Sequence, residues 1–321
     1  MMMHEEKPPL GPIEPGQLPV VKAPDAIWDS ILASLDAGRV PERGGFRWWQ
    51  FAAASSLLIG VIALWYSTRP QPPSWEVVRL DGSPSVGSKR VAETSRIAVG
   101  EWLQTDASSR ASIKIGQAGT GEIGTVEVEP NSRIRLVVAK PNEHRLALAR
   151  GEISAVVSAP PRLFFVDTPA STAVDLGCAY RMKTDESGSG LLRVTVGWVA
   201  LEWKGRESLV PAGANCRTKS GAGPGTPYFS DASDTLQQAL SAFDFDKGSS
   251  EAVRVVLSES RVRDTLTLWH LLSRVDPEER VRVFDRMVEL TPLPDGVSRE
   301  RVLDLDKDTL QHWRQELAWK W

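Results

Sequence analysis

A run of 21 residues without a formal charge lies between Arg47 and Arg69, and it constrains the chain more than any other feature. At about 1.5 Å rise per residue, a helix of this length spans roughly 30 Å, the thickness of a bilayer's hydrocarbon core. Aromatic residues stand at both ends of the run, as in interfacial belts, and prolines follow it. The run therefore predicts a transmembrane helix over residues 47–68, with its apolar part from Trp48 to Thr68.

Two other interpretations of this run are less suitable. A buried helix of a soluble core is disfavoured because no polar stripe appears at helical spacing. A cleaved signal peptide is disfavoured because some 46 residues precede the run. We therefore expect a single-pass anchor. A slight excess of arginines on the N-terminal side favours a cytoplasmic N-terminus, with the bulk of the chain outside the cytoplasm.

The N-terminal tail, residues 1–46, is rich in proline and mixed in charge. Asp25 is a suitable N-cap for one short helix, whose apolar face would consist of Ile27, Trp28, Ile31, Leu32 and Leu35. An isolated helix of this length is marginal in water, so this face is expected to contact a cytoplasmic partner. Two alternatives stay open: a helix lying on the membrane surface, and a disordered tail.

Residues 75–217 alternate apolar and polar side chains in many short runs. The apolar positions of these runs are Ala111, Ile113, Ile115, Val126, Val128, Ile134, Leu136, Val138, Leu192, Val194, Val196, Val199, Leu201 and Trp203. Turn-forming segments such as DGSPSVGS, KPNE and DESGSG separate the runs. The pattern predicts a mainly β domain, an antiparallel sandwich or coiled sheet with its apolar side inward.

The pattern changes after the β region. A Gly/Pro-rich linker is predicted over residues 218–232, and an all-α helical domain over 233–321. Asp276 followed by proline is a well-formed helix start, and Ser249, Asp264 and Asp308 are suited to cap further helices. We expect these short helices to form a small bundle or a set of hairpins.

The motifs of the chain do not indicate catalysis. The letters G-x-G-x-x-G occur over residues 119–124, but the strand-like TVEVEP follows them, so a glycine-rich hairpin is expected rather than a nucleotide site. The four histidines lack a triad partner by spacing, and DLDKD lacks the glycine and glutamate of a calcium loop. A net charge of -3 does not suit direct binding of nucleic acid. We expect no enzymatic activity, cofactor or metal.

An ordered series of segments in the β region resembles the FecR domain family. The segments are WEVVRLDGSPSV, VGEWLQTDASSRASIKI, VEPNSRIRLV, LARGEISAVV, FFVDTPASTAVDLGCAYRM and LLRVTVGWVAL, between about residues 75 and 215. The resemblance implies an extracytoplasmic β domain on a single-pass anchor in the bacterial inner membrane. It also implies a regulator that senses an envelope protein or receptor outside and controls an alternative sigma factor inside. The alternative is an envelope scaffold or binding module without sigma-factor control.

The chain has two cysteines, Cys178 and Cys216. In the extracytoplasmic location that the resemblance implies, a disulfide between them is permitted. It would close a span of 38 positions, and the chain-entropy model assigns roughly 4 kcal/mol to such a loop. We expect this disulfide to fasten the last strand to the sheet. The alternative is two separate buried thiols.

Overall fold

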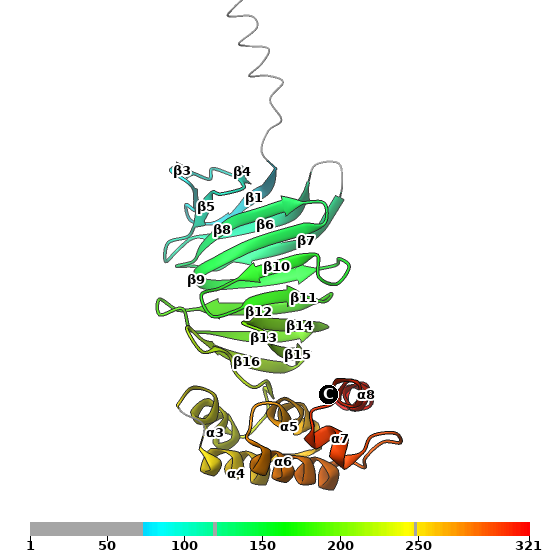
Figure 1. Cartoon of the computed structure of the whole chain (residues 1–321). Helices are drawn as coiled ribbons and strands as arrows, with labels where there is room; N and C mark the ends of the chain where they lie inside the picture. Colours follow the sequence, from blue (N-terminus) through cyan, green and yellow to red (C-terminus); the bar gives the residue numbers. More distant parts are fainter. Residues whose placement is uncertain (1–72, 118–120, 247–248) are drawn as a thin grey trace, which may run out of the picture. The chain divides into compact units, whose positions relative to one another are not determined.

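The computed structural model of the chain describes residues 73–117, 121–246 and 249–321. Residues 71–321 form one compact unit, in which strands are followed by helices (Figure 1). The strands are β1 Ser74–Asp81, β2 Ser85–Val86, β3 Lys89–Arg90, β4 Thr94–Ala98, β5 Trp102–Gln104, β6 Arg110–Gln117, β7 Gly121–Val128, β8 Arg133–Lys140, β9 Glu143–Val157, β10 Phe164–Asp167, β11 Thr172–Asp175, β12 Ala179–Thr184, β13 Gly190–Val196, β14 Trp198–Trp203, β15 Arg206–Pro211, β16 Ala214–Lys219, β17 Gly223–Pro224 and β18 Tyr228–Phe229. The helices are α3 Asp234–Phe245, α4 Ser250–Glu259, the 3₁₀ turn η1 Val262–Asp264, α5 Thr265–Leu272, α6 Pro277–Leu290, α7 Arg299–Leu303 and α8 Lys307–Ala318.

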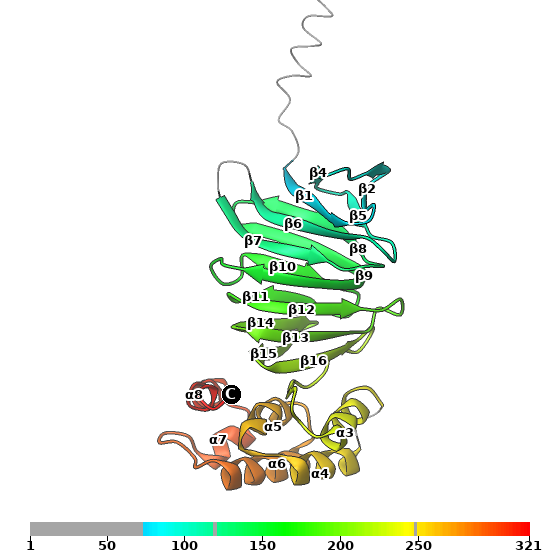
Figure 2. The same cartoon turned by 180° about the vertical axis from the view of Figure 1, so that it is seen from behind.

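Two sheets make up the β region, and we call them sheet A and sheet B. Sheet A contains β1, β4, β6, β7, β12, β13 and β16, with the short β17 and β18 beside β16. Sheet B contains β2, β3, β5, β8, β10, β11, β14 and β15. Figure 2 shows the β region extending from β1 near one end to β16 at the other. Among the described strands the pairings are antiparallel, except that β10 runs parallel to β9.

The long strand β9 joins the two sheets by bending at Gly151. Residues before the bend pair with β8 in sheet B, and residues after it pair with β7 and β12 in sheet A. Gly151 has a positive φ of 97°, and a Cβ there would lie 2.1 Å from Ser132 Oγ. Glycine is therefore required at the corner both for its backbone conformation and for the close approach of the neighbouring loop.

The inward faces of both sheets supply one hydrophobic core, as the alternating pattern predicted. Ala111, Ile113 and Ile115 are all fully buried, as are Ile134 and Leu136 on β8 and Val199 and Leu201 on β14. The predicted positions Val138 and Trp203 are only partly buried and lie outside this core. Val196 is an exception, since 61% of its surface is exposed. The register of β12 against β13 shifts at the neighbouring Ala179, so the alternation breaks there and Val196 turns outward.

The predicted fold is corrected in one component, the transmembrane helix. In the part of the chain that the structure describes, no helix has both the length and the apolar character needed to cross a bilayer. The longest of the helices named above, α6, has 14 residues, whereas a span needs about 20. The segment 47–68 for which the span was predicted lies outside the described residues. The described fold is a mostly β unit with a C-terminal helical region.

The segment 218–232 differs from the linker that its glycines and prolines suggested. Strand β16 continues to Lys219, and β17 and β18 both pair with it. Tyr228 and Phe229 are buried, Tyr228 in the helical core and Phe229 in the β core. The segment thus joins the sheet to the helices as a packed connection.

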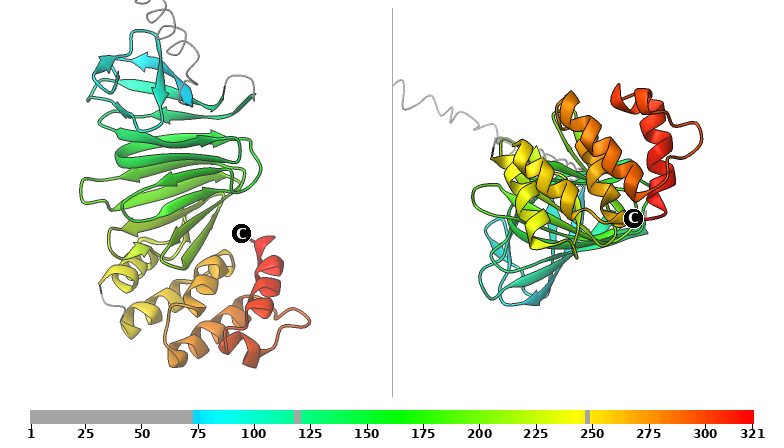
Figure 3. Two further views of the ribbon diagram at one scale, coloured as in Figure 1. Left: turned by 45° about the horizontal axis from the view of Figure 1, so that its top comes forward. Right: turned by 90° about the horizontal axis from the view of Figure 1, so that it is seen from below.

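The helices pack side by side around a second core (Figure 3). Two predicted caps are confirmed, because Ser249 accepts from Ala252 N at 3.1 Å and Asp276 accepts from Glu279 N at 2.9 Å. The cap of α8 was predicted at Asp308 but lies two residues earlier. Asp306 accepts from Thr309 N, and Asp308 falls in the first turn. Phe284 and Trp313 contact each other in the centre of this second core.

Candidate functional site

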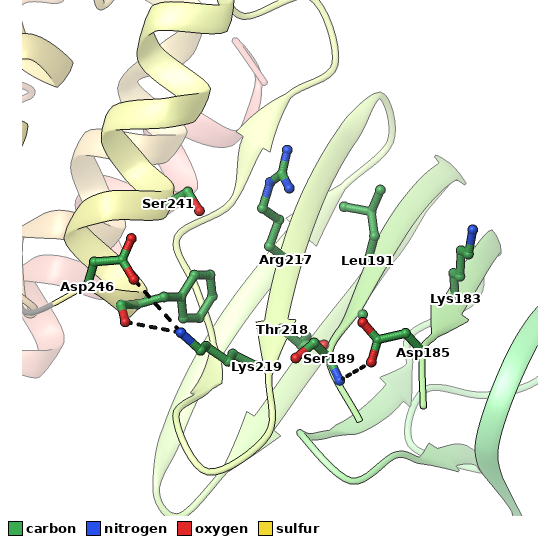
Figure 4. A pocket seen from close by; sticks show the side chains of 11 residues that line it. Lys183, Asp185, Ser189, Leu191, Arg217, Thr218, Lys219, Ser241 and Asp246 are labelled. Atoms are coloured by element: carbon green, nitrogen blue, oxygen red, sulfur yellow. Dashed lines mark hydrogen bonds and ion pairs between the residues drawn. The ribbon is translucent and has the colours of Figure 1, made fainter. Parts of the chain in front are cut away.

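A cavity of about 350 Å³ lies between the outer face of sheet A and helix α3 (Figure 4). Three cationic side chains line it, Lys183 from β12 and Arg217 and Lys219 from β16. Leu191 of β13 and Phe245 of α3 add apolar surface. We call this cavity the basic groove, and its lining is completed by Asp185, Ser189, Gly190, Thr218, Ser241 and Asp246.

The strand register explains why the cations gather on one face. Side chains alternate along a strand, so the buried Met182 and Cys216 leave their neighbours Lys183 and Arg217 pointing outward. Leu191 pairs with both of these cations, and the three side chains form one row across three strands. Neighbouring strands are about 4.8 Å apart, which places the bases of the two cationic side chains about 10 Å apart. Figure 4 shows the row beside α3.

Helix α3 forms the second wall of the groove. Ser233 caps its N-terminus by accepting a hydrogen bond from the backbone N–H of Leu236. Leu236 and Leu240 are buried in the helical core and hold the helix in place. Ser241 and Phe245 lie one turn apart and line the groove, because residues four apart share a helix face.

Two of the three cations have no counter-ion among the described residues. Lys219 Nζ lies 3.9 Å from Asp246 Oδ1 and donates to the backbone carbonyl of Phe245 at 3.3 Å. The C-terminal end of a helix dipole also favours a cation at this point. Lys183 and Arg217, in contrast, form no ion pair with any residue that the structure describes. The groove therefore carries positive charge that the described chain does not balance.

Asp185 also lines the groove, but its carboxylate forms no ion pair with a described residue and accepts hydrogen bonds within its own turn. Oδ1 accepts from Ser187 Oγ at 2.6 Å and from the backbone N–H groups of Ser187 and Ser189 at 2.8 and 3.0 Å. Hydrogen bonding from the Ser187 hydroxyl, and then from these amides, lowers the pKa of Asp185. The three lining cations outnumber the two lining carboxylates, Asp185 and Asp246, so the groove is suited to carboxylate or phosphate groups, which lysine and arginine bind through charge-assisted hydrogen bonds.

A buried ion pair behind the groove fixes α3 against the sheet. Asp244 of α3 accepts from Thr226 N at 2.6 Å and Thr226 Oγ1 at 2.9 Å, and Arg274 Nη1 lies 3.4 Å from its Oδ1. Arg274 Nη2 in turn donates to Ser208 Oγ on β15 at 2.7 Å. Burial raises the pKa of Asp244, and the charge of Arg274 opposes that shift. We treat the pair as ionised, since every polar contact of the carboxylate comes from a donor.

Two more hydrogen bonds join α5 to the β region, one to Pro227 between β17 and β18 and one to β15. Thr267 Oγ1 donates to the carbonyl of Pro227 at 2.8 Å, and His270 Nε2 lies 3.1 Å from the carbonyl of Leu209. Burial, and then the charge of Arg274, lower the pKa of His270 to about 3, so the ring is neutral and donates through Nε2. These bonds, together with the ion pair, make the groove a preformed site between two rigidly joined parts.

The predicted disulfide is not formed, because Cys178 and Cys216 are both free and buried. Cys178 Sγ donates to Asp175 Oδ2 at 2.5 Å, and Cys216 Sγ donates to the carbonyl of Gly225 at 3.1 Å. Cys216 pairs with Leu192 on β13, whereas the residue after Cys178 pairs four positions further along, with Val196. Four residues of strand separate the two thiols by roughly 13 Å, twice the Cα separation that a disulfide tolerates.

Other residues that the sequence singled out do not contribute to this site. The tail face formed by Ile27, Trp28, Ile31, Leu32 and Leu35 lies outside the described residues. The described part of the glycine motif, residues 121–124, begins strand β7, which pairs antiparallel with β6, so the predicted hairpin is confirmed. In the described ranges, no group of three or more His, Cys, Asp or Glu side chains is arranged to hold a metal ion.

The cations of the groove were missed from the sequence, although a signal is present there. Lys183 and Arg217 each alternate with buried neighbours, as solvent-facing residues of an amphipathic strand do. Their proximity depends on the pairing of β12 and β16 with β13, which a period of two does not reveal. The contribution of Phe245 depends on the position of α3, which tertiary packing determines.

No family model matches the chain, and no curated protein matches it. Two crystal structures of a proposed anti-sigma factor from Parabacteroides distasonis ATCC 8503 are similar to part of it. One is 14% identical with a TM-score of 0.34, covering 43% of this chain and 63% of that one. The other is 15% identical with a TM-score of 0.30, covering 42% and 64%.

These matches span less than two thirds of either neighbour's length, and their TM-scores are too low to establish a common fold. The class of protein therefore follows from the geometry described above. The chain is a two-sheet β unit joined to a helical region, with a cationic groove at the place where they meet.

Proposed function

We propose that this chain is a regulatory binding protein that receives an anionic ligand in the basic groove. The observation that carries the proposal is the pair Lys183 and Arg217, two exposed cations on either side of Leu191 without an ion-pair partner in the described chain. The groove is preformed, because the Asp244–Arg274 pair fixes α3 behind it. A preformed cationic cavity binds an anion without having to order its own walls, which favours recognition.

We further propose that the chain belongs to the FecR-domain proteins and controls an alternative sigma factor through its N-terminal tail. The ordered segments that resemble that family fall on successive strands, from WEVVRLDGSPSV on β1 and β2 to LLRVTVGWVAL on β13 and β14. In this proposal the groove receives the signal. The apolar face around Trp28 and Leu32 would bind the sigma factor.

The binding of an anion can be tested with citrate as the probe. Isothermal titration calorimetry of the full chain at low ionic strength should show binding. The variant K183Q/R217Q should weaken it about tenfold, since two exposed charge interactions are lost. The matched control is K89Q/R90Q, which removes the same charge from the exposed strand β3 in sheet B. Equal citrate affinities for the native chain and both variants would contradict the proposal. So would the absence of binding to the native chain at about 10 mM citrate, because a Kd of that size corresponds to a binding free energy of only about -3 kcal/mol.

Control of a sigma factor can be tested separately at the tail. The full chain should co-purify with a sigma factor, and W28D/L32D should abolish this because two apolar contacts are lost. S30D/A33D is the control, since helical spacing places these positions on the other face. If both double variants retain the sigma factor, the tail proposal fails.

A binding module without sigma-factor control is the second candidate, and one observation favours it. The basic groove lies wholly within residues 71–321, so it needs no part of the tail. Citrate binding that is sensitive to K183Q/R217Q, combined with no sigma factor in the co-purification, would select this candidate.

A further inference from the structure

We infer that the anionic ligand is an acidic segment of a partner protein, which lies across the outer face of sheet A and ends in the basic groove. This inference rests on the proposed function of the groove and adds the identity of the ligand class. It commits to a polypeptide because the cationic surface continues beyond the groove to Arg181 on β12 and Arg193 on β13. A small anion would need the groove alone.

The outward-facing residues of sheet A form three parallel rows. The first row is the one that enters the groove, and it runs from Glu152 through Lys183 and Leu191 to Arg217. The second row contains Ser154, Arg181, Arg193 and Asn215. The third row contains Val156, Ala179 and Val196. Rows on one face are two residues apart, so the first and third rows are separated by about 13 Å.

A second cavity connects the first row to the second. It has a volume of about 150 Å³ and is lined by Glu152, Arg181, Lys183, Leu191 and Arg193. Lys183 and Leu191 also line the basic groove, so the two hollows share a wall. Together they provide a continuous depression from α3 toward the middle of the sheet. At about 3.3 Å per residue, an extended peptide of four or five residues spans the roughly 13 Å between the first and third rows.

The second row contains an unfavourable contact that an acidic partner would relieve. Arg181 and Arg193 are directly opposed on antiparallel strands, and like charges in this position destabilise a sheet. Arg181 has one weak counter-ion, Glu152 at 3.7 Å, while Arg193 forms no ion pair with a described residue. Carboxylates placed over the pair would turn this repulsion into attraction. A cation pair without that compensation is therefore an indication of a binding surface.

The third row gives the surface an apolar end. Val156 and Val196 are 55% and 61% exposed, and Ala179 lies between them. A segment that matches the three rows would thus carry carboxylates over the arginines and lysine, and an apolar side chain over the valines. The whole chain has a net charge of -3, so this basic face is a local feature and does not reflect the overall composition.

Fluorescence anisotropy with a labelled synthetic peptide tests the inference on the full chain. The probe has two valines followed by five glutamates, and the same peptide with lysines in place of the glutamates is the control. The native chain should bind the acidic peptide and not the basic one. Binding should weaken as salt is raised, since the contacts are exposed and screened.

The decisive variant is R181Q/R193Q, which changes the second row and leaves the groove residues intact. It should weaken peptide binding about tenfold while citrate binding stays unchanged. K89Q/R90Q is again the matched control, and it should alter neither affinity by more than about twofold. Thermal unfolding of both double variants should show that the fold is retained, because the four substituted side chains are all exposed.

The outcomes separate this inference from the proposed function. If R181Q/R193Q binds the peptide as the native chain does, while K183Q/R217Q loses citrate, the ligand is confined to the groove and the inference is wrong. If K183Q/R217Q alters neither ligand, the proposed function fails as well. If sedimentation shows that R181Q/R193Q converts a dimer into a monomer, the face is an interface between copies of this chain and the inference is also wrong.

Discussion

Replacing Arg274 with methionine tests whether the buried ion pair holds the helical region on the sheet. The side chains of Arg274 and Asp244 are 7% and 5% exposed. Removing the cation would leave the carboxylate buried with only Thr226 as a donor, and would also take away the donor to Ser208 Oγ. Breaking a buried pair by removing one partner costs about 3–5 kcal/mol. We expect about 3 kcal/mol, since Arg206 also acts on the carboxylate.

A double-mutant cycle separates the pair from its surroundings. In D244N/R274M the asparagine is neutral and can still accept from Thr226, so the buried charge is removed along with its partner. The double variant should be about 2 kcal/mol more stable than the sum of the single changes D244N and R274M predicts. The exposed pair of Lys219 and Asp246 provides the comparison, and D246N should change stability by less than about 0.5 kcal/mol.

Urea unfolding and hydrogen exchange measure these effects in the full chain. Unfolding gives the free energy, and exchange of the α3 amides reports whether the helix detaches before the sheet unfolds. Exchange in R274M should accelerate in α3 while the central strands keep their protection. Two results would refute the coupling of α3 to β15 through this pair. One is a loss of unfolding free energy below about 1 kcal/mol for R274M, and the other is a double variant whose loss equals the sum of the losses of D244N and R274M.

Three further predictions concern the described residues. The pKa of His270 is lowered by burial to about 3, so the folded state binds fewer protons than the unfolded state, and stability is lost as pH falls from about 6.5 toward 3. At pH 5 the loss should be about 2 kcal/mol in the native chain, and urea titrations of H270Q should lack this component. G151A should lower the unfolding free energy by more than about 3 kcal/mol, because its Cβ would clash with Ser132 at a positive φ. A soluble G151A chain of native stability would show that the bend of β9 does not depend on glycine. R193Q should raise the unfolding free energy by about 0.2–1 kcal/mol, because it removes the repulsion from Arg181, and a decrease in urea titrations would contradict the reading of that contact.

The sequence predicts the sheet better than it predicts what surrounds the sheet. Ile113 and Ile115 alternate with polar residues, and a period of two is enough to assign them to the inner face. Val196 follows the same alternation and is nevertheless exposed, because one irregularity in register near Ala179 reverses its direction. Local pattern carries no information about such a shift, which depends on how β12 and β13 pair.

The candidate site depends even more on long-range pairing. Lys183 and Arg217 are 34 positions apart in the sequence, and β13 brings them into one row. The disulfide was expected because two cysteines in an oxidising compartment commonly pair, but strand register keeps Cys178 and Cys216 apart. The sequence therefore predicted one contact that does not form and missed another that does. In both cases the pairing of strands that are distant in the sequence decided the outcome.

The last turn of α3 connects the groove to the buried ion pair. Asp244 points to Arg274 and Thr226, while Phe245 and Asp246, the next two residues, line the groove and hold Lys219. An anion that competes for Lys219 removes a contact from the same turn that carries Asp244. If the groove binds an anion as proposed, we expect binding and attachment of the helices to be linked through these three consecutive residues. By reciprocity, we then expect R274M, which should loosen this turn, to alter the affinity for citrate in titration calorimetry, and an unchanged affinity would contradict the linkage.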